Sequence, residues 1–216
     1  MMRIEAPAPR LRLLFAVGGG GDPMRHFGLL QALAAQGCTV LAPHFNRLTS
    51  PVPSLAEVEA RIDGLLAALE DVGEPDLPLV GLGHSLGTVA LLALAGARGQ
   101  VLSGEGFSVA QPLAFRRLVL LAPPAQFFGL PGALDRVEVL AQVWTGGADR
   151  ITPPGLGASL AAGLSGRIPV DLRHDPAAGH FTFMDTPPPG QAEPHPDRTA
   201  FLRELAAAMG TFLTAI

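Results

Sequence analysis

The sequence contains no lysine and no tyrosine, and all fifteen of its basic residues are arginines. The absence of lysine excludes a Schiff-base lysine, the lysine of a P-loop and a Ser-Lys catalytic dyad. Cys38 is the only cysteine, so the chain can form neither an intramolecular disulfide nor a cysteine-rich metal site. Its place between an expected helix and an expected strand predicts a buried, inert thiol.

Charge is also scarce, at 16% of residues, and the formal net charge is −4. This composition gives no reason to expect attraction to nucleic acid or to an anionic membrane. No apolar window approaches the length of a membrane span, and the run at residues 13–17 is too short for a signal peptide. We therefore expect a cytoplasmic protein with no nucleic-acid and no membrane partner. A length of 216 residues fits a single domain, residues 1–216, with a substantial core.

Apolar segments of strand length alternate along the chain with segments of helical character. Strands are expected at residues 11–17, 39–45, 77–82, 117–122, 138–145 and 168–173, and helices at residues 26–36, 53–71, 86–95, 154–164 and 197–214. Ser54 and Asp197 are the expected N-caps of two of these helices, and Glu57 completes a capping box with Ser54. The alternation predicts an α/β fold: a mostly parallel central sheet of about six strands with helices on both faces. Ligands bind such sheets at the carboxyl ends of the strands.

A Gly-His-Ser-Leu-Gly pentapeptide at residues 83–87 joins one apolar run to another. This G-x-S-x-G pattern is typical of a sharp strand-to-helix turn that lifts a serine hydroxyl clear of the backbone. Gly83 and Gly87 suit such a turn, because a Cβ at either position would collide with the neighbouring strand or helix. Ser85 is thus the candidate nucleophile, and Gly96 is expected to end the helix that follows. The competing interpretation is a glycine-rich turn that merely contains a serine.

A serine nucleophile needs a base and a group that orients the base. His180 lies in the loop after the last expected strand, from which an imidazole can reach over the serine, and it is favoured over His174. Asp149 follows the fifth expected strand in a glycine turn and is the candidate orienting carboxylate. The alternatives are a surface histidine and a turn aspartate that bonds its own backbone. Weaker carboxylate candidates, which do not follow a strand in this way, are Asp135, Asp175 and Asp185.

An oxyanion hole would complete this site. The backbone amide of Leu86, at the start of the buried helix, is one candidate donor, and the helix dipole would assist it. The second donor is expected from the four glycines at residues 18–21, after the first strand. A dinucleotide-binding loop is the rival interpretation. It is disfavoured because Pro23 replaces the third glycine of G-x-G-x-x-G and because the next strand ends in Pro43 and His44, without an acidic residue.

The order Ser85, Asp149, His180, each after an expected strand, resembles the α/β-hydrolase superfamily, from about residue 11 to the end of the chain. The compact size is similar to the dienelactone-hydrolase-like and small serine esterase branch. The resemblance implies Gly19 as the second oxyanion donor, although Val17 stands where many members have a histidine. Dienelactone hydrolases proper use a cysteine nucleophile, so Ser85 argues against that activity.

Substrate signals are weaker than the catalytic ones. Residues 123–137 are too few for the helical cap of larger hydrolases, so no large cap domain is expected. Phe127 and Phe128 are the candidate substrate-binding residues, and core packing is the equal alternative. The connection from Gln100 to Arg116 is long enough to form the edge of a lid. The proline-rich residues 186–196 are expected to form a surface loop.

These observations predict a serine hydrolase that cleaves small-molecule carboxylic esters or thioesters through an acyl-enzyme, with no metal and no organic cofactor. A peptidase or an acyltransferase could use the same residues. A third possibility, from another class, is a ligand-binding protein that keeps the hydrolase fold and turns over slowly. The sequence does not define the acyl chain, the leaving group or the oligomeric state.

Overall fold

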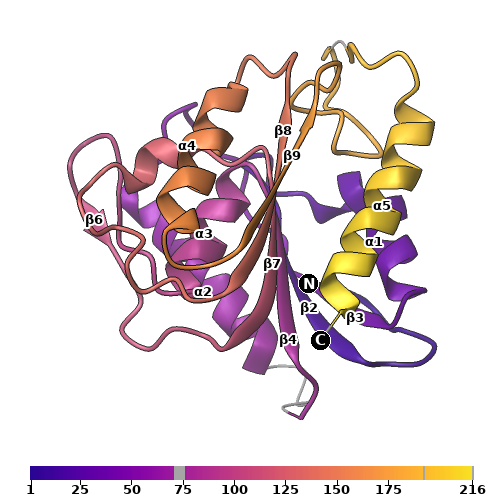
Figure 1. The fold of residues 1–216 in the computed structure, drawn as a ribbon, viewed down its shortest axis with the longest axis horizontal. Coiled ribbons are helices and arrows are strands. Elements are labelled where there is room, and N and C mark those ends of the chain that lie inside the picture. Colours follow the sequence, from indigo (N-terminus) through magenta and orange to yellow (C-terminus); the bar gives the residue numbers. More distant parts are fainter. Residues whose placement is uncertain (71–75, 192, 216) are drawn as a thin grey trace.

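The computed structural model describes residues 1–70, 76–191 and 193–215. Their main feature is a seven-stranded sheet in the order β1-β3-β2-β4-β7-β8-β9, parallel except that β1 runs antiparallel to β3 (Figure 1). The strands are β1 (Met2–Ile4), β2 (Leu11–Ala16), β3 (Cys38–Ala42), β4 (Leu79–His84), β7 (Phe115–Leu121), β8 (Leu140–Gly146) and β9 (Val170–Asp175). The predicted α/β class with a mostly parallel sheet is therefore confirmed.

Helices cover both faces of this sheet (Figure 1). They are α1 (Phe27–Ala34), α2 (Leu55–Glu70), α3 (Leu86–Leu94), α4 (Pro154–Ser165) and α5 (Arg198–Thr214), with short 3₁₀ helices η1 (Pro23–His26) and η2 (Ala125–Phe128). α1 and α5 pack together on one face, and α2, α3 and α4 lie on the other. The predicted end of the second helix, at residue 71, lies outside the described residues.

The order in which strands are added to the sheet reverses between the parallel neighbours β2 and β4. From β2 the chain moves outward to β3, and from β3 it returns across β2 to β4. Because parallel crossovers are right-handed, the two connecting helices, α1 and α2, fall on opposite faces of the sheet. Ala16 lies opposite Gly83 at the carboxyl ends of β2 and β4, so the glycine loop and the Ser85 turn begin side by side. This reversal is the place where α/β sheets bind ligands.

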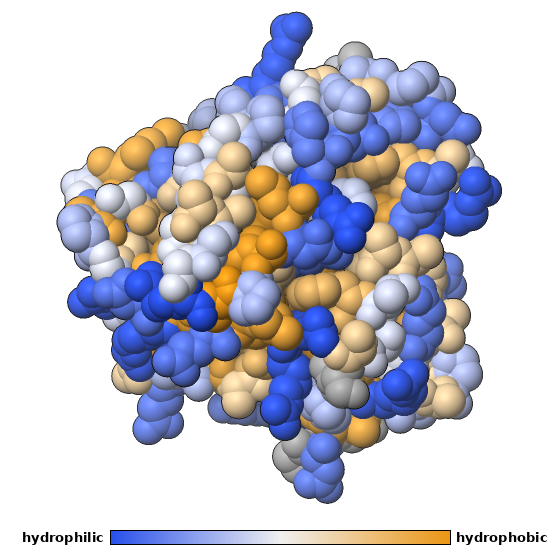
Figure 2. All heavy atoms as spheres, viewed as in Figure 1, coloured by the Kyte–Doolittle hydropathy of each residue, from blue (hydrophilic) through white to orange (hydrophobic). Residues whose placement is uncertain are grey.

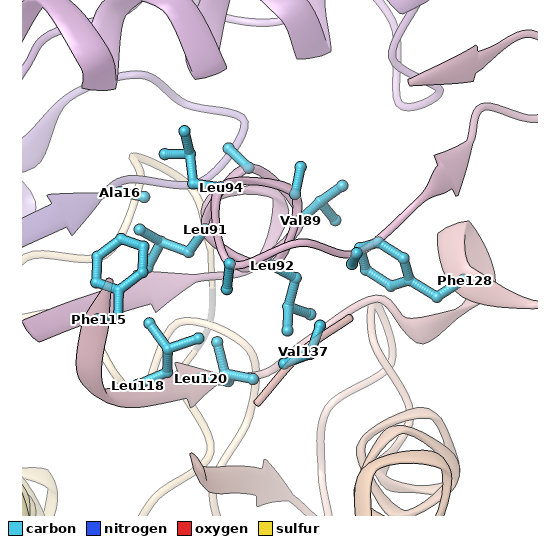
Figure 3. Close-up of a cluster of buried hydrophobic side chains, with 14 of the residues drawn as sticks. Ala16, Val89, Leu91, Leu92, Leu94, Phe115, Leu118, Leu120, Phe128 and Val137 are labelled. Carbon is cyan, nitrogen blue, oxygen red and sulfur yellow. The ribbon is translucent and has the colours of Figure 1, made fainter. Parts of the chain in front are cut away.

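Each face of the sheet has its own hydrophobic core. α3 lies at the centre of one core, and every one of its nine residues is buried. Figure 3 shows side chains from α3 surrounded by Phe115, Leu118 and Leu120 of β7 and by Phe128. Full burial of a Leu, Val or Phe side chain stabilises a fold by about 1.5–3 kcal/mol, so this helix is a major source of stability. The apolar run after Ser85 reflects that burial.

Both edges of the sheet discourage pairing with another strand. β1 has only three residues, and β9 has the sequence VDLRHD with charged groups along an exposed edge. Figure 2 shows that hydrophilic residues border an apolar band at the centre of the face viewed. Short edge strands and edge charges are common protections against aggregation. β1 was not predicted from the sequence, because three residues carry too little periodicity to indicate a strand.

Two segments for which no helix or strand was predicted, residues 123–137 and the connection from Gln100 to Arg116, add only short elements to the sheet and its helices. Residues 123–137 contain η2 and turns, and no large cap covers the described residues. The long connection forms a two-stranded ribbon of β5 (Gly99–Gln100) and β6 (Gly106–Phe107), beside α2 and η2. Within the described ranges, no helix is long and apolar enough to cross a membrane.

Candidate active site

Ser85 occupies the turn between β4 and α3 and has φ 52° and ψ −127°. A positive φ is unfavourable for a residue with a Cβ and persists only where the surroundings enforce it. The amide of Ser85 donates to the carbonyl of Leu121, 2.9 Å away, which attaches the turn to the next strand. A Cβ on Gly83 would lie 2.9 Å from the Thr88 backbone, and one on Gly87 would overlap the Ala16 carbonyl oxygen. The two flanking glycines therefore allow the close packing that holds the serine outward.

Asp149 and His180 contact each other at the carboxyl edge of the sheet. His180 Nδ1 lies 2.8 Å from Asp149 Oδ2, and both side chains are buried. The Thr152 hydroxyl donates to the same Oδ2 over 2.7 Å, while the amides of Ile151 and Thr152 donate to Oδ1, each over 2.8 Å. Asp149 is thus both the turn aspartate and the partner of a histidine. Its rotamer is fixed by groups on its own turn.

The electrostatics of this pair favour an ionised carboxylate. Burial alone would raise the pKa of Asp149, but the hydrogen bonds from His180 and Thr152 and the nearby imidazole outweigh burial, so the pKa lies below its ordinary value. An ionised carboxylate only accepts hydrogen bonds, so His180 Nδ1 carries the proton. The other ring nitrogen of a neutral His180, Nε2, is then the unprotonated one.

Ser85 and His180 line the same cavity, which has a volume of about 520 Å³. No hydrogen bond joins the Ser85 hydroxyl to His180 in the described part of the chain, and such bonds are often long before substrate binds. The lining residues come from three loops at the carboxyl edge and from the Ser85 turn. They are Gly18, Gly19, Gly20, Arg25, Arg47, Leu48, Thr49, Ser50, Pro51, His84, Ser85, His180, Phe181, Met184, Pro188, Pro189 and Gln191.

The glycine loop after β2 is held in place by the loop that follows β3. The amide of Leu48 donates to the Gly19 carbonyl over 2.9 Å, and the buried Arg61 guanidinium of α2 lies 3.5 Å from the same oxygen. With its carbonyl held in this way, Gly19 lies on the cavity wall beside Ser85. Leu86 is the first residue of α3, so its amide has no acceptor within the helix. Both expected oxyanion donors are therefore close to the serine in the fold.

Two further histidines near the cavity, His26 and His84, are fully buried, and His84 contributes to the cavity wall. His84 Nε2 lies 3.0 Å from the carbonyl of His180, and His26 Nδ1 lies 3.1 Å from the carbonyl of Phe183. Burial lowers the pKa of His84 well below its usual value and that of His26 to about 4. Both rings are therefore neutral at pH 7, and each donates to a carbonyl of the segment that carries His180. Neither residue was predicted from the sequence to have this role.

Several predicted residues lie elsewhere. Phe127 and Phe128 are 5% and 8% exposed, their rings face Phe107 of the β5–β6 ribbon, and neither lines the cavity. Both side chains are buried against the ribbon and therefore cannot reach the cavity. The structure thus agrees with the alternative interpretation, in which the two residues pack in the core. His174 is exposed on β9, where its Nδ1 contacts the Thr145 hydroxyl. None of the described residues 100–116 lines the cavity, so the ribbon is no lid over it.

Other cavity residues were missing from the sequence analysis. The proline-rich loop was expected only to be a surface segment, yet Pro188, Pro189 and Gln191 form part of the cavity wall, while residue 192 lies outside the described residues. Arg25 and Arg47 also line it. Only their position in the sequence could have indicated this, because each arginine lies in the segment that follows the carboxyl end of a strand. In the described ranges, no group of three or more His, Cys, Asp or Glu side chains is arranged to hold a metal ion.

No family model matches the sequence, and no curated protein matches it. Solved structures match nearly the whole chain. The monoacylglycerol lipase of Paleococcus ferrophilus has a TM-score of 0.67 at 15% identity, with 97% of this chain and 98% of that chain covered. A serine hydrolase homologue from Coxiella burnetii has a TM-score of 0.68 at 15% identity, covering 99% and 90%. A propionate-bound esterase from Thermogutta terrifontis has a TM-score of 0.63 at 16% identity, covering 98% and 87%.

At these identities the likeness establishes the fold. The chain has the α/β-hydrolase fold, and the resemblance recognised in the sequence is confirmed at that level. Among the described residues the sheet has seven strands, compared with the six expected.

Proposed function

We propose that this protein is a serine hydrolase that cleaves small-molecule carboxylic esters or thioesters through an acyl-enzyme intermediate. The observation that carries the proposal is that a strained, outward-held Ser85 shares one cavity with His180, which is paired with Asp149. The names of the similar structures, a lipase, an esterase and a serine hydrolase homologue, support a hydrolase that acts on esters. A cytoplasmic location stays a prediction.

In the proposed reaction, Ser85 Oγ attacks the carbonyl carbon while its proton moves to His180 Nε2. Asp149 holds the Nδ1–H of the ring and stabilises the imidazolium. The amides of Gly19 and Leu86 donate to the oxyanion of the tetrahedral intermediate. The intermediate collapses when the alcohol or thiol leaves with the proton from His180. Water, activated by the same imidazole, then attacks the acyl-serine, and the acid is released with Ser85 restored.

A fluorophosphonate probe tests this proposal, because it labels serines that are activated as nucleophiles. We expect rapid labelling and turnover of 4-nitrophenyl esters by the native chain, and loss of both in Ser85→Ala. Ser103→Ala is the matched control, since Ser103 lies on the exposed β5–β6 ribbon and bonds Glu105. A folded native protein that takes up no label at Ser85 would contradict the proposal. Labelling with negligible turnover would instead favour the ligand-binding alternative.

A further inference from the structure

The cavity around Ser85 contains two arginines that the proposed reaction does not use. Arg25 belongs to η1, after the glycine loop, and Arg47 belongs to the loop that follows β3. The two side chains therefore reach one cavity from two different strand ends. Neither is part of the His180–Asp149 pair.

The charges of the cavity wall are all of one sign. The only Arg, Asp or Glu side chains among its described lining residues are Arg25 and Arg47. Neither arginine takes part in an ion pair recorded for the described chain. Asp149 lies behind His180 and its charge is directed to that ring and to its own turn. The described cavity wall thus carries two cationic groups and no carboxylate, although the whole chain has a net charge of −4.

Arg25 is already held in position. Its Nη1 donates to the carbonyls of Thr186 and Pro187, over 3.3 and 3.0 Å, and the side chain is half-buried. A guanidinium has five N–H donors in a fixed planar fork, so these two bonds leave donors for a ligand. Since the side chain is restrained before binding, a ligand would lose little by ordering it. Arg47 is exposed and makes no recorded hydrogen bond among the described residues.

We propose that the preferred substrates are esters or thioesters that carry a second, anionic group such as a carboxylate, bound by Arg25 and Arg47. The proposal rests on the proposed function, because it assigns the substrate class of the same site. Guanidinium groups bind carboxylates through charge-assisted hydrogen bonds, which are stronger than neutral ones. Two cations on a cavity wall also raise the encounter rate with anions.

The test compares matched substrates that differ only in the charge of the second group. One pair places the charge on the acyl side: the 4-nitrophenyl monoester of glutaric acid and its methyl ester. The other pair places it on the leaving group: 4-acetoxybenzoate and its methyl ester. We expect kcat/KM at least about 10-fold higher for the anionic member of one pair, and a decline of that preference with added salt. The pair that responds identifies the arm of the substrate that the arginines bind.

Variants connect the preference to the arginines. Arg47→Gln should reduce kcat/KM for the anionic member about 10-fold and affect the neutral member much less, so that the preference falls. Arg25→Gln should act in the same direction, although it also removes bonds to the Thr186 and Pro187 carbonyls. Arg116→Gln is the charge-matched control, because Arg116 is exposed at the opposite, amino end of β7.

Equal rates for both members of each pair, with fluorophosphonate labelling of Ser85 intact, would overturn this inference and leave the proposed function standing. An anionic preference that survives in the Arg25→Gln/Arg47→Gln double variant would overturn it as well. If no ester is cleaved and Ser85 takes up no label, the proposed function itself fails.

Discussion

At the residue scale, Asp149 joins two tasks in a single carboxylate. One oxygen caps its own turn through the amides of Ile151 and Thr152, and the other accepts from His180. From the sequence, a turn aspartate and a catalytic aspartate are alternatives, because a sequence shows only local spacing. The structure contains both arrangements, while the catalytic role stays a prediction.

Asp149→Asn tests that role. An amide keeps the size of the side chain but presents an NH₂ group, which favours the wrong tautomer of His180. We expect kcat for ester hydrolysis to fall about 10⁴-fold with the fold retained. Asp135→Asn, which removes an exposed partner of Arg167, serves as the control and should not change kcat. Native-like turnover in Asp149→Asn would contradict the assignment.

Asp149 should also contribute to stability in a pH-dependent way. Its pKa in the folded chain lies below the ordinary value of about 4, so between the two values the unfolded chain binds more protons. The stabilisation is therefore present above pH about 4 and is lost as the pH falls through the folded pKa. Urea unfolding from pH 7 downward should show a smaller decrease in Asp149→Asn than in the native chain. An identical decrease in both proteins would refute this account.

His84 is expected to position His180 rather than to react. Its Nε2–H reaches the His180 carbonyl, and Gln can place an amide N–H near the same point. His84→Leu leaves that carbonyl without its donor, so kcat should fall about 10-fold at nearly constant KM. His84→Gln should restore most of the loss. If the two variants lose stability and activity in parallel, with no rescue of kcat by Gln, the role is merely structural.

At the element scale, the helix ends were the most predictable parts. Ser54 and Glu57 form the reciprocal bonds of a capping box at the start of α2, and Asp197 accepts from the Ala200 amide at the start of α5. Gly96 ends α3 with φ +110°, as expected of a C-terminal glycine. Such signals are local, so they can be seen in a sequence. Phe127 and Phe128 were harder to place, since their core position depends on a ribbon that approaches from another part of the chain.

Gly87→Ala tests the close packing of α3 on β2. The new methyl group would overlap the Ala16 carbonyl, so the helix or the strand must shift. We expect a loss of about 1–3 kcal/mol in the free energy of unfolding, together with lower activity, because Ser85 immediately precedes this helix. Gly155→Ala in α4 is the matched control. A Cβ there meets open space, so the change should be neutral or stabilise by up to about 1 kcal/mol. Equal stability of the two variants would contradict the packing argument.

At the scale of the whole molecule, the sheet explains why distant residues meet. Ser85, Asp149 and His180 follow β4, β8 and β9, and parallel strands bring their carboxyl ends to one edge. That rule needs only the order of elements, so the sequence could predict the edge at which these residues lie. The cavity wall depends on loop conformations after β3 and β9, which no periodicity encodes. The arginines and the proline-rich wall were therefore visible only in the structure.

The same frame explains the position of the glycine loop. It follows β2, the neighbour of β4, and the loop after β3 binds it through Leu48 and Phe45 amides. The proposed oxyanion donors are thus fixed by two neighbouring strands before any substrate arrives. Preorganised donors of this kind supply a large part of the rate in acyl transfer.

The central claim is that Ser85 carries the acyl group during turnover. The direct measurement is rapid acid quenching during the first turnover of a 4-nitrophenyl ester, followed by peptide mapping by mass spectrometry. The account predicts a burst of nitrophenol and a covalent acyl group on Ser85, both absent in Ser85→Ala. An acyl group found on another residue during ester turnover would contradict the claim. Undiminished ester turnover by Ser85→Ala would contradict it as well.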